Sequence, residues 1–404
     1  MDILGEHIVI QKGKMPRNLS DNQSKRFKYP YIDIKAFEKG SLRRYTDGEK
    51  CLLCDNNDIL IVWDGARCGL VGKAISGAVG STLAVIKPKE SVQREYVYYF
   101  LKSQFLIFNT RVKGVGIPHL DPFLVHHSSL IIPSLPEQHR IVAKLEELLS
   151  ELEKGKEQLH TALDQLKVYR QAVLKYAFEG KLTNNEKLKS KNEKIENGEL
   201  PKGWKWVKLG EKLDFVGSGI TPKGGREVYQ SSGVIFIRSQ NVYPNKLELD
   251  DVAYISDKID ERMKRTRVQP DDVLLNITGA SIGRSAFVPS KFPRANVNQH
   301  VCILRSNQNT LFSKYLSSYL NSSRAQSEIM NTQSGATRQG LNFEQIRNLN
   351  LPICPIEEQH RIVQEIESRL SVADKLEETI TASLQQSETL RQSILKKAFE
   401  GKLV

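Results

Sequence analysis

The chain has 404 residues, of which 39% are hydrophobic and 26% charged, a balance typical of a globular protein of two or three domains. It has no apolar run of about 18 residues and no basic segment followed by an apolar core at its start. We therefore expect neither a membrane span nor a secretory leader. The five cysteines, an odd number, indicate a reducing cytoplasm, and the net charge of +12 favours a polyanionic partner such as nucleic acid.

Residues 1–134 are predicted to form a mixed domain of strands and helices, called the first head below. Short β-branched runs bounded by turn residues, at 58–63 and 82–86, are typical of buried strands. A stripe of aromatic residues and leucines at 95–108 indicates a helix.

Residues 135–182 are predicted to form one long helix. Ser134 is a suitable N-cap, Glu137 follows it by three residues as in a capping box, and Pro136 is tolerated in the first turn. Gly180 is suited to end the helix. About 40 residues at 1.5 Å each would span roughly 60 Å, which is too long for the inside of a compact domain.

Residues 183–203 are rich in Lys, Glu and Asn and are predicted to be a solvated linker. A second globular block, the second head, is predicted at 204–353, and a second long helix at 354–404. Apolar residues recur every seven positions along both helices, which predicts a coiled-coil seam. The seam residues are Leu145, Leu152, Leu159 and Leu166 in the first helix and Ile366, Leu376 and Ile380 in the second, where the pattern is weaker.

The segment 137–182 repeats as 358–403, 221 residues later and without a gap. Both copies begin with EQHRIV and end with AFEGKL, and half of the 46 aligned positions are identical. A repeat this long and ungapped does not arise by chance. The chain is therefore two copies of one unit.

The two heads are also related, but more distantly. Asp58 and Gly65 of the first head match Asp272 and Gly279 of the second, while the loops between such positions differ. The two heads therefore share scaffold positions but differ in their loops, and each is joined to a near-identical helix. This pattern is typical of two binding modules with two specificities.

The catalytic signatures that we tested are missing from the sequence. The stretch 65–74 has Arg67 and Ala74 where a Walker phosphate loop needs Gly and Ser/Thr. Cys51 and Cys54 have no second pair at zinc spacing. Neither an Asn-Pro-Pro-Phe/Tyr methylation signature nor a glycine-rich S-adenosyl-methionine loop occurs. We predict a non-catalytic protein with no metal or cofactor of its own.

Together with EQHRIV and AFEGKL, the PKGW motif at 201–204 and the GITP turn at 219–222 identify a family. Over essentially its whole length, the chain resembles the DNA-specificity subunit of type I restriction-modification systems. The resemblance implies an α+β fold with two target-recognition domains, the heads, joined by two long antiparallel coiled-coil helices in a pseudo-twofold repeat. One departure is that the first head begins at Leu4 without the Pro-x-x-Trp opening present at Trp204. Either its first strand is trimmed or its partner contacts differ.

The resemblance also implies the function and the partners. Each head would read one half of a split, asymmetric double-stranded DNA site. Two methylation (M) subunits would dock on the chain, and restriction (R) subunits would join them in the cytoplasm. S-adenosyl-methionine, ATP and Mg would be used by these partners, which carry the adenine-N6 methyltransferase and endonuclease activities.

Within each head, Lys and Arg on loops are expected to neutralise phosphates, while planar polar groups read base edges in the major groove. The candidates lie where a strand ends or beside a glycine turn. In the second head they are Arg238, Ser239, Asn241, Thr278, Ser281, Arg284, Gln299, Thr337, Arg338 and Gln339. Repeat equivalence and loop position give Lys35, Arg43, Arg44, Asp64, Arg67, Lys113 and His119 in the first head.

The near-identity of EQHRIV and AFEGKL in both halves fits one surface presented twice, to two copies of the same partner. The candidate docking residues are Glu137, Gln138, His139, Arg140, Phe178 and Glu179, with Glu358, Gln359, His360, Arg361, Phe399 and Glu400 in the second copy. The alternative is that both motifs are helix ends that each half of the protein needs for its own packing.

Three other functions compete with this interpretation. A related restriction system whose partner fuses methylation and cleavage in one chain would use a similar subunit. A basic coiled-coil scaffold would give no reason for diverged loops on matched frames, and only weak, salt-sensitive binding to DNA. A free-standing DNA enzyme is opposed by the missing catalytic motifs.

Overall fold

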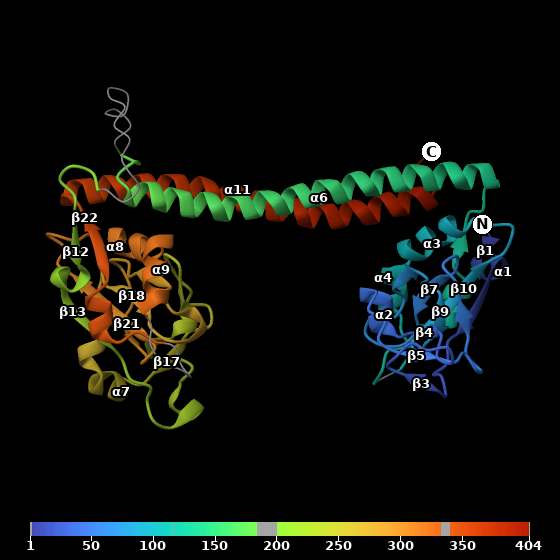
Figure 1. Cartoon of the computed structure of the whole chain (residues 1–404), viewed down its shortest axis with the longest axis horizontal. Helices are drawn as coiled ribbons and strands as arrows, with labels where there is room; N and C mark the ends of the chain where they lie inside the picture. The colour runs from blue at the N-terminus through green and yellow to red at the C-terminus, as the bar shows by residue number, and fades with distance from the viewer. Residues whose placement is uncertain (1, 115, 184–199, 333–339, 404) are drawn as a thin grey trace. The chain divides into compact units, whose positions relative to one another are not determined.

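A computed structural model describes residues 2–114, 116–183, 200–332 and 340–403. The chain forms two compact units, Met1–His160 with Thr381–Val404 and Thr161–Ile380 (Figure 1). Each unit contains one head and part of both long helices. Within the described residues, no helix is both long enough and apolar enough to cross a membrane.

The first head combines two larger sheets and the two-stranded pair β1-β11 with short helices. Its strands are β1 (Asp2–Ile3), β2 (Ile8–Lys12), β3 (Leu19–Ser20), β4 (Tyr29–Ile32), β5 (Tyr45–Thr46), β6 (Leu53–Cys54), β7 (Ile59–Val62), β8 (Val71–Lys73), β9 (Gly77–Val79), β10 (Leu83–Pro88) and β11 (Ser129–Leu130). Its helices are α1 (Leu4–His7), α2 (Ile34–Lys39), α3 (Arg94–Ser103), α4 (Phe105–Thr110) and α5 (Pro122–His126). The main sheet has the order β2-β10-β7-β8, and a second has the order β3-β5-β4-β9-β6.

The second head has the corresponding elements. Its strands are β12 (Lys205–Lys208), β13 (Leu213–Ser218), β14 (Val234–Ile237), β15 (Val242–Tyr243), β16 (Lys246–Leu247), β17 (Ala253–Ile255), β18 (Val273–Asn276), β19 (Ser285–Phe287), β20 (Ala295–Val297), β21 (Val301–Ser306) and β22 (Asn350–Ile353). Its α-helices are α7 (Asp257–Arg262), α8 (Ser313–Leu320), α9 (Ser323–Thr332) and α10 (Phe343–Arg347). Short 3₁₀ helices are η1 (Leu209–Lys212), η2 (Gly225–Val228), η3 (Ser239–Asn241), η4 (Lys264–Thr266) and η5 (Gly279–Ser281).

The sheets explain the distant repeat seen in the sequence. The main sheet of the second head has the order β13-β21-β18-β19, which matches β2-β10-β7-β8 strand for strand. Each head also contains one parallel pair, β4 with β9 and β14 with β20. The predicted strand at 58–63 is β7, whose four residues are all buried because both faces of the sheet are covered. The predicted helix at 95–108 is divided into α3 and α4.

The departure at the start of the first head has a structural counterpart. In the second head, all four residues of β12 pair with β22, from Lys205 opposite Ile353 to Lys208 opposite Asn350. In the first head only Asp2 and Ile3 of β1 pair with β11. The first strand is therefore shorter.

Both long helices are present, α6 (Leu135–Phe178) and α11 (Ile356–Phe399), with 44 residues each. The glycine cap predicted for the first helix is present, and the second helix has one as well. Gly180 has a φ of 68°, and the N–H of Lys181 donates to the carbonyl of Tyr176 at 2.9 Å. Gly401, with a φ of 70°, ends α11 in the same way.

Within each unit the two helices run antiparallel. In the unit that contains the first head, Arg391 lies 3.2 Å from Glu153 and Lys156 lies 2.6 Å from Glu388, so residue numbers rise along α6 while they fall along α11. In the other unit Arg170 lies 2.6 Å from Asp374. The two arginine pairs occupy equivalent positions in the repeat, so each unit contains the same helix–helix contact.

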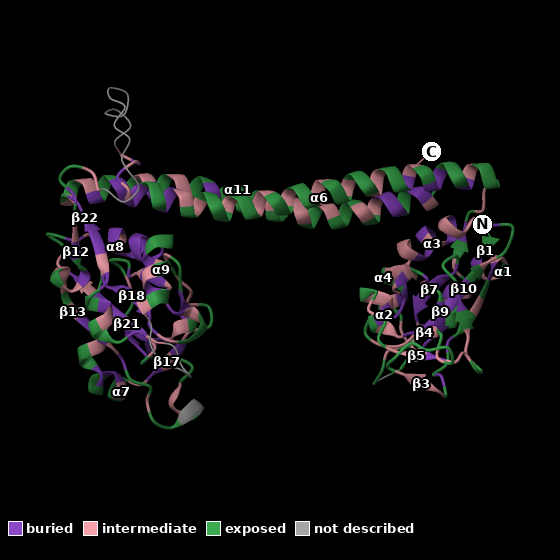
Figure 2. Cartoon of the chain, viewed as in Figure 1, coloured by how far each residue is buried: buried purple, intermediate pink, exposed green. Residues whose placement is uncertain are grey.

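Burial varies along the predicted seam (Figure 2). Leu145 and Ile366 are buried in the cores that the heads form with the helices. Leu152, Leu159, Leu166 and Ile380 are half-buried, and Leu376 is 50% exposed. Two helices alone cannot enclose a seam residue on all sides, so Leu376 lines an open groove of about 460 Å³ with Leu166 and Ile380.

The main sheet of the second head contains a buried carboxylate paired with an arginine. Asp272 is fully buried, and Arg305 donates to it through Nε and Nη2 at 2.7 and 2.9 Å. Burial raises the pKa of Asp272, although the hydrogen bonds and charge of Arg305 oppose the rise. The equivalent pair in the first head is looser, since Lys87 lies 3.6 Å from Asp58 and is 47% exposed.

We expect Arg305→Met to destabilise the second head by about 3–5 kcal/mol, because it removes the charged partner of a buried carboxylate and leaves that carboxylate the N–H of Gln269. Lys87→Met, the matched change in the first head, should cost no more than about 1 kcal/mol. Chemical denaturation of both variants measures the two losses. Equal losses would show that Arg305 contributes no more than an exposed ion pair.

Candidate nucleic-acid interface

In the first head, polar side chains from three chain segments meet beside the glycine turn that follows β7. Nδ1 of His119 lies 2.6 Å from Oδ1 of Asp64, and Nζ of Lys12 lies 2.9 Å from its Oδ2. Two backbone hydrogen bonds between Lys113 and His119 hold the loop in place. Burial alone would raise the pKa of Asp64, but the hydrogen bonds from Lys12 and His119 outweigh it and lower that pKa. The carboxylate is therefore ionised at neutral pH.

A second group of basic candidates surrounds α2. Arg44 lies 3.1 Å from the aspartate that caps this helix, and Arg67 lies 2.6 Å from Glu38 near its end. Lys35 and Arg43 are exposed on the same segment. Arg67 is 64% exposed and belongs to the same glycine turn as Asp64. The basic candidates of the first head thus lie on the glycine turn and on the segment of α2, where Arg44 and Arg67 are paired with acidic residues.

In the second head, Thr278 occupies the place of Asp64. Thr278 forms an isolated backbone bridge with Gly340, as Asp64 does with His119. Its Oγ1 lies 2.6 Å from Nδ1 of His300. The same frame position therefore carries a carboxylate in one head and a hydroxyl in the other, and each is held by a histidine.

The remaining candidates of the second head lie on both sides of this position. Ser281 accepts a hydrogen bond from Asn276 at 3.1 Å, and Gln299 is exposed next to His300. Ser239 is half-buried. Two arginines lie near tyrosine rings: the guanidinium of Arg238 is 5.8 Å from the ring centre of Tyr229, and that of Arg284 is 5.2 Å from Tyr243.

Asn241 has a different role from the one predicted. It is 2% exposed, its amide oxygen accepts from the N–H of Arg238 at 3.0 Å, and its amide nitrogen donates to the carbonyl of Glu248 at 3.0 Å. A buried amide with both ends bonded stabilises the turn and is not available to a base. Thr337, Arg338 and Gln339 lie outside the described residues.

Two residues near these clusters were not predicted from the sequence. Lys12 ends strand β2 and approaches Asp64 from 52 residues away, so no local pattern marks it. His300 follows the predicted Gln299 directly and shares its turn between β20 and β21, which was the available signal.

The glutamine of each EQHRIV copy joins a helix to its own head. Gln138 is fully buried; its Oε1 accepts from the N–H of Gln93 at 2.7 Å, and its Nε2 donates to the carbonyl of Pro133 at 3.0 Å. Gln359 is also fully buried and bonds in the same way to the N–H of Phe312 at 2.9 Å and the carbonyl of Cys354 at 2.9 Å. These side chains are needed within the fold.

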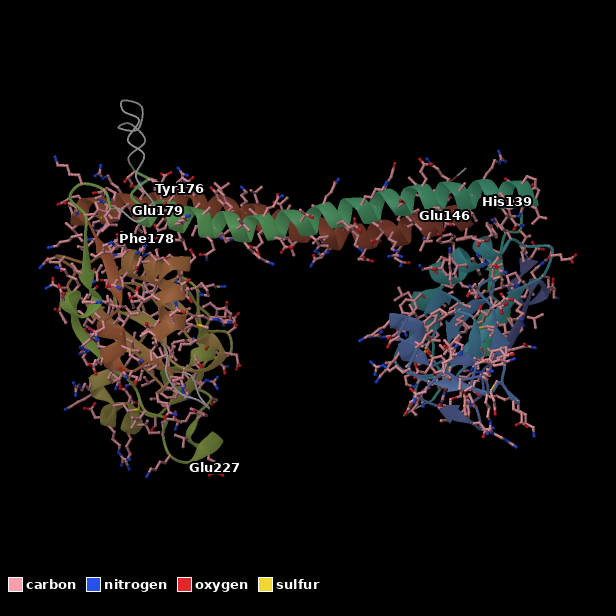
Figure 3. The ribbon with its side chains drawn as sticks, in the orientation of Figure 1. His139, Glu146, Tyr176, Phe178, Glu179 and Glu227 are labelled. Carbon is pink, nitrogen blue, oxygen red and sulfur yellow. The ribbon has the colours of Figure 1, made fainter. Side chains whose placement is uncertain are left out.

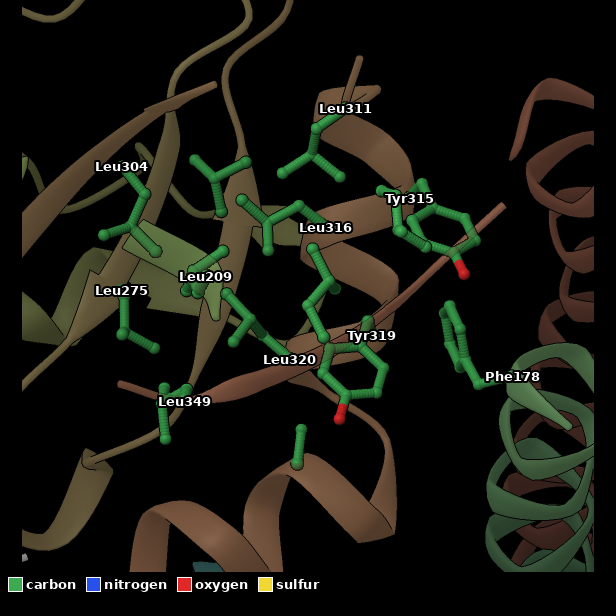
Figure 4. Packing of buried hydrophobic residues seen from close by; sticks show 14 of the residues in the cluster. Phe178, Leu209, Leu275, Leu304, Leu311, Tyr315, Leu316, Tyr319, Leu320 and Leu349 are labelled. Carbon is green, nitrogen blue, oxygen red and sulfur yellow. The ribbon is translucent and has the colours of Figure 1, made fainter. Parts of the chain in front are cut away.

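The phenylalanine of each AFEGKL copy packs on the head of its unit. Phe178, at the end of α6, contacts Tyr315 and Tyr319 of the second head, with ring centres 5.1 Å apart in both cases (Figure 4). Phe399, at the end of α11, contacts Tyr96 and Phe100 of the first head at 5.1 and 5.4 Å. Each head is thus held by the start of one helix and the end of the other.

The other docking candidates are accessible. His139 and Glu179 mark the two ends of α6 (Figure 3). The exposed candidates are His139, Arg140, His360, Arg361 and Glu400. Glu137, Glu179 and Glu358 are half-exposed. A docking surface built from the repeated motifs would therefore use their charged members, while Gln and Phe hold the helix to the head.

We expect Gln138→Ala to reduce the free energy of unfolding by about 1–3 kcal/mol, because it leaves a buried N–H and a buried carbonyl unpaired. His139→Ala, one residue further on and exposed, should change it by no more than about 0.5 kcal/mol. Denaturant titration compares the two. A loss at position 139 as large as that at position 138 would contradict this division of roles.

The described residues hold no group of three or more His, Cys, Asp or Glu side chains that could bind a metal ion. Cys51 and Cys54 are free thiols, and burial is the main reason that the pKa of Cys54 is raised to about 11. A thiol with so high a pKa is protonated at neutral pH and is a poor nucleophile.

Comparisons with known proteins agree with this architecture. The family model described as the type I restriction modification DNA specificity domain matches residues 4–160 and 201–386. The EcoBI specificity subunit of Escherichia coli is 27% identical over 383 residues, which cover 93% of this chain and 80% of that protein. The MjaVIII specificity subunit of Methanocaldococcus jannaschii is 23% identical over 405 residues, which cover 99% of this chain and 92% of that protein.

A solved structure has a similar fold. The HsdS subunit from Thermoanaerobacter tengcongensis has a TM-score of 0.56 at 19% identity, with 100% of this chain and 96% of that chain covered. Since the family model matches both heads and most of both helices, the chain belongs to the family of type I restriction-modification DNA-specificity subunits.

Proposed function

We propose that this chain reads a bipartite, asymmetric DNA site, one half with each head, and that its helix pair sets the spacer between the halves and docks the methylation subunits. The main observation behind the proposal is that the two heads have equivalent backbone positions that carry different side chains. At one bridge position the first head has Asp64 and His119, and the second has Thr278 and Gly340. Two readers of the same sequence would have no reason to differ there.

The basic character of the chain supports DNA as the ligand. Its net charge is +12, and exposed cations such as Lys113, Arg67 and Arg43 lie on or beside the candidate turns of the first head. Phosphate contacts of this kind supply affinity and orientation, while polar groups at the strand ends supply the sequence preference.

We propose further that catalysis belongs to the partners. Two M subunits would engage the charged members of EQHRIV and AFEGKL, one at each copy, because the same motif presented twice suits two copies of one protein. R subunits would join that complex, and S-adenosyl-methionine, ATP and Mg would be bound by M and R in the cytoplasm. A single partner that fuses methylation and cleavage is less favoured, because the relatives compared above are subunits of type I enzymes.

The test is methylation mapping by long-read sequencing in a host without adenine methylation. This chain is expressed with the methyltransferase encoded beside it, and each gene is also expressed alone. We expect N6-methyladenine in both halves of one split motif, only when both genes are present. An intact purified complex that modifies no motif would contradict the proposal and favour a scaffold.

A further inference from the structure

Lys12, Asp64 and His119 of the first head form a cluster whose contacts fix which atoms donate and which accept hydrogen bonds. Its members come from β2, from the turn after β7 and from the loop that pairs back on that turn. Asp64 is only 17% exposed, whereas His119 is 47% and Lys12 is 43% exposed. The carboxylate is therefore covered by its two partners, and the imidazole is presented to solvent.

The contact with Asp64 determines which nitrogen of His119 carries the proton. An ionised carboxylate has no hydrogen to donate, so Nδ1, 2.6 Å away, must be the donor. Lys12 donates to the same carboxylate at 3.2 Å and favours its ionised form. In the neutral imidazole Nε2 is then an acceptor, and among the described residues it has no hydrogen-bond partner.

Backbone hydrogen bonds also hold the loop that carries His119, in addition to the contact of its side chain with Asp64. The N–H of His119 donates to the carbonyl of Lys113 at 2.8 Å, and the N–H of Lys113 donates back at 2.9 Å. The N–H of Gly65 donates to the carbonyl of Pro118 at 2.8 Å, which joins the loop to the glycine turn. A side chain on such a cross-connected loop is held in place before a ligand arrives, as recognition of a base edge requires.

We propose that His119 is a base-reading residue of the first head and that its Nε2 accepts a hydrogen bond from an exocyclic amino group, N6 of adenine or N4 of cytosine, in the major groove. These are the only base groups that donate there, so an acceptor at this place selects adenine or cytosine on the contacted strand. Asp64 and Lys12 are positioning residues, which set the proton on Nδ1. The inference rests on the proposed DNA-reading function and assigns one position of its first half-site.

The proposal predicts that one substitution, which exchanges the donor and the acceptor nitrogen of His119, changes the base preference. In Asp64→Asn, Lys12 still donates to the amide oxygen, so the amide nitrogen faces Nδ1 and donates to it. Nδ1 then becomes the acceptor and Nε2 carries the hydrogen. A donor at Nε2 fits O6 of guanine in the place of N6 of adenine, or O4 of thymine in the place of N4 of cytosine. We expect one position of the first half-site to shift from adenine toward guanine, or from cytosine toward thymine.

Two substitutions at position 119 complete the series. His119→Gln keeps an acceptor near the place of Nε2 and should retain the preference. His119→Leu removes it, and discrimination at that one position should fall roughly ten- to hundredfold, the range that one base contact supplies. His7→Leu is the matched control, because His7 is a half-buried histidine of the same head whose Nδ1 lies 2.9 Å from Oγ of Ser91.

The experiment is methylation mapping with the full complex. It is followed by competition among DNA duplexes changed at one position at a time. Retention of the second half-site in every variant shows that the complex is assembled. If His119→Leu keeps the motif, or lowers binding to all sequences equally, the assignment is overturned, since a phosphate contact behaves in that way. If the wild-type complex itself gives no motif, the failure lies with the proposed function instead.

Discussion

A fragment of residues 1–182 is expected to form a homodimer that directs methylation to a symmetric site, in which the first half-site occurs twice in inverted orientation. The reason lies in the helix ends. The first head is completed by Phe399 of AFEGKL, which packs on Tyr96 and Phe100. The fragment ends in an identical AFEGKL whose Phe178 can take that place in a second copy.

The helix contacts of such a dimer are compatible with this exchange, with one exception. Arg170 is the repeat equivalent of Arg391, so Glu153 of one copy would meet Arg170 of the other. Lys156, however, would meet Lys167 in place of Glu388. Like charges at a protein surface repel by a few tenths of a kcal/mol. Salt screens this repulsion and the attraction between Glu153 and Arg170 alike, so added salt should change the dimer affinity little.

Sedimentation measures the dimer, and methylation mapping with the partner methyltransferase measures its specificity. Phe178→Ala is the informative variant. Loss of a buried Phe costs about 3–5 kcal/mol, and each dimer would lose two. A fragment that stays monomeric at high concentration, or a dimer that modifies the same asymmetric site as the whole chain, would refute the prediction.

Inserting one heptad into both helices is expected to change the spacer of the DNA site and leave both half-sites unaltered. The insertions belong between His160 and Thr161 and between Ile380 and Thr381, where one unit ends and the other begins. Seven residues lengthen a helix by roughly 10 Å and nearly preserve the face of the seam. The residues that hold the heads, Gln138, Phe178, Gln359 and Phe399, remain in their own units.

Methylation mapping gives the spacer directly. The matched control is the same heptad inserted into α6 alone, which makes α6 seven residues longer than α11 between the two units. The ion pairs Arg391 with Glu153 and Arg170 with Asp374 cannot then both stay in register along one straight helix pair, and modification should be abolished. An unchanged spacer in the double insertion would show that the helix pair does not act as a ruler. Altered half-sites would show that the heads do not read DNA independently of the helices.

The sequence by itself determined the repeat, both long helices with their glycine caps, and the family. These features are encoded by residues close together in the chain. A seven-residue period, the glycine at 180 and the motifs EQHRIV and AFEGKL are each visible within a short window. The frame of the heads was also partly visible, since buried strands such as β7 are continuous β-branched runs.

Only the tertiary structure decided how these parts pack on one another. It placed Phe178 on the second head and Phe399 on the first, and it buried Gln138 and Asn241, which had been taken for binding residues. It also brought Asp64 to His119, 55 residues away in the chain. Such contacts depend on the path of the whole backbone. A local pattern shows that a side chain is polar, but burial and long-range partners decide whether it holds the fold together or faces a ligand.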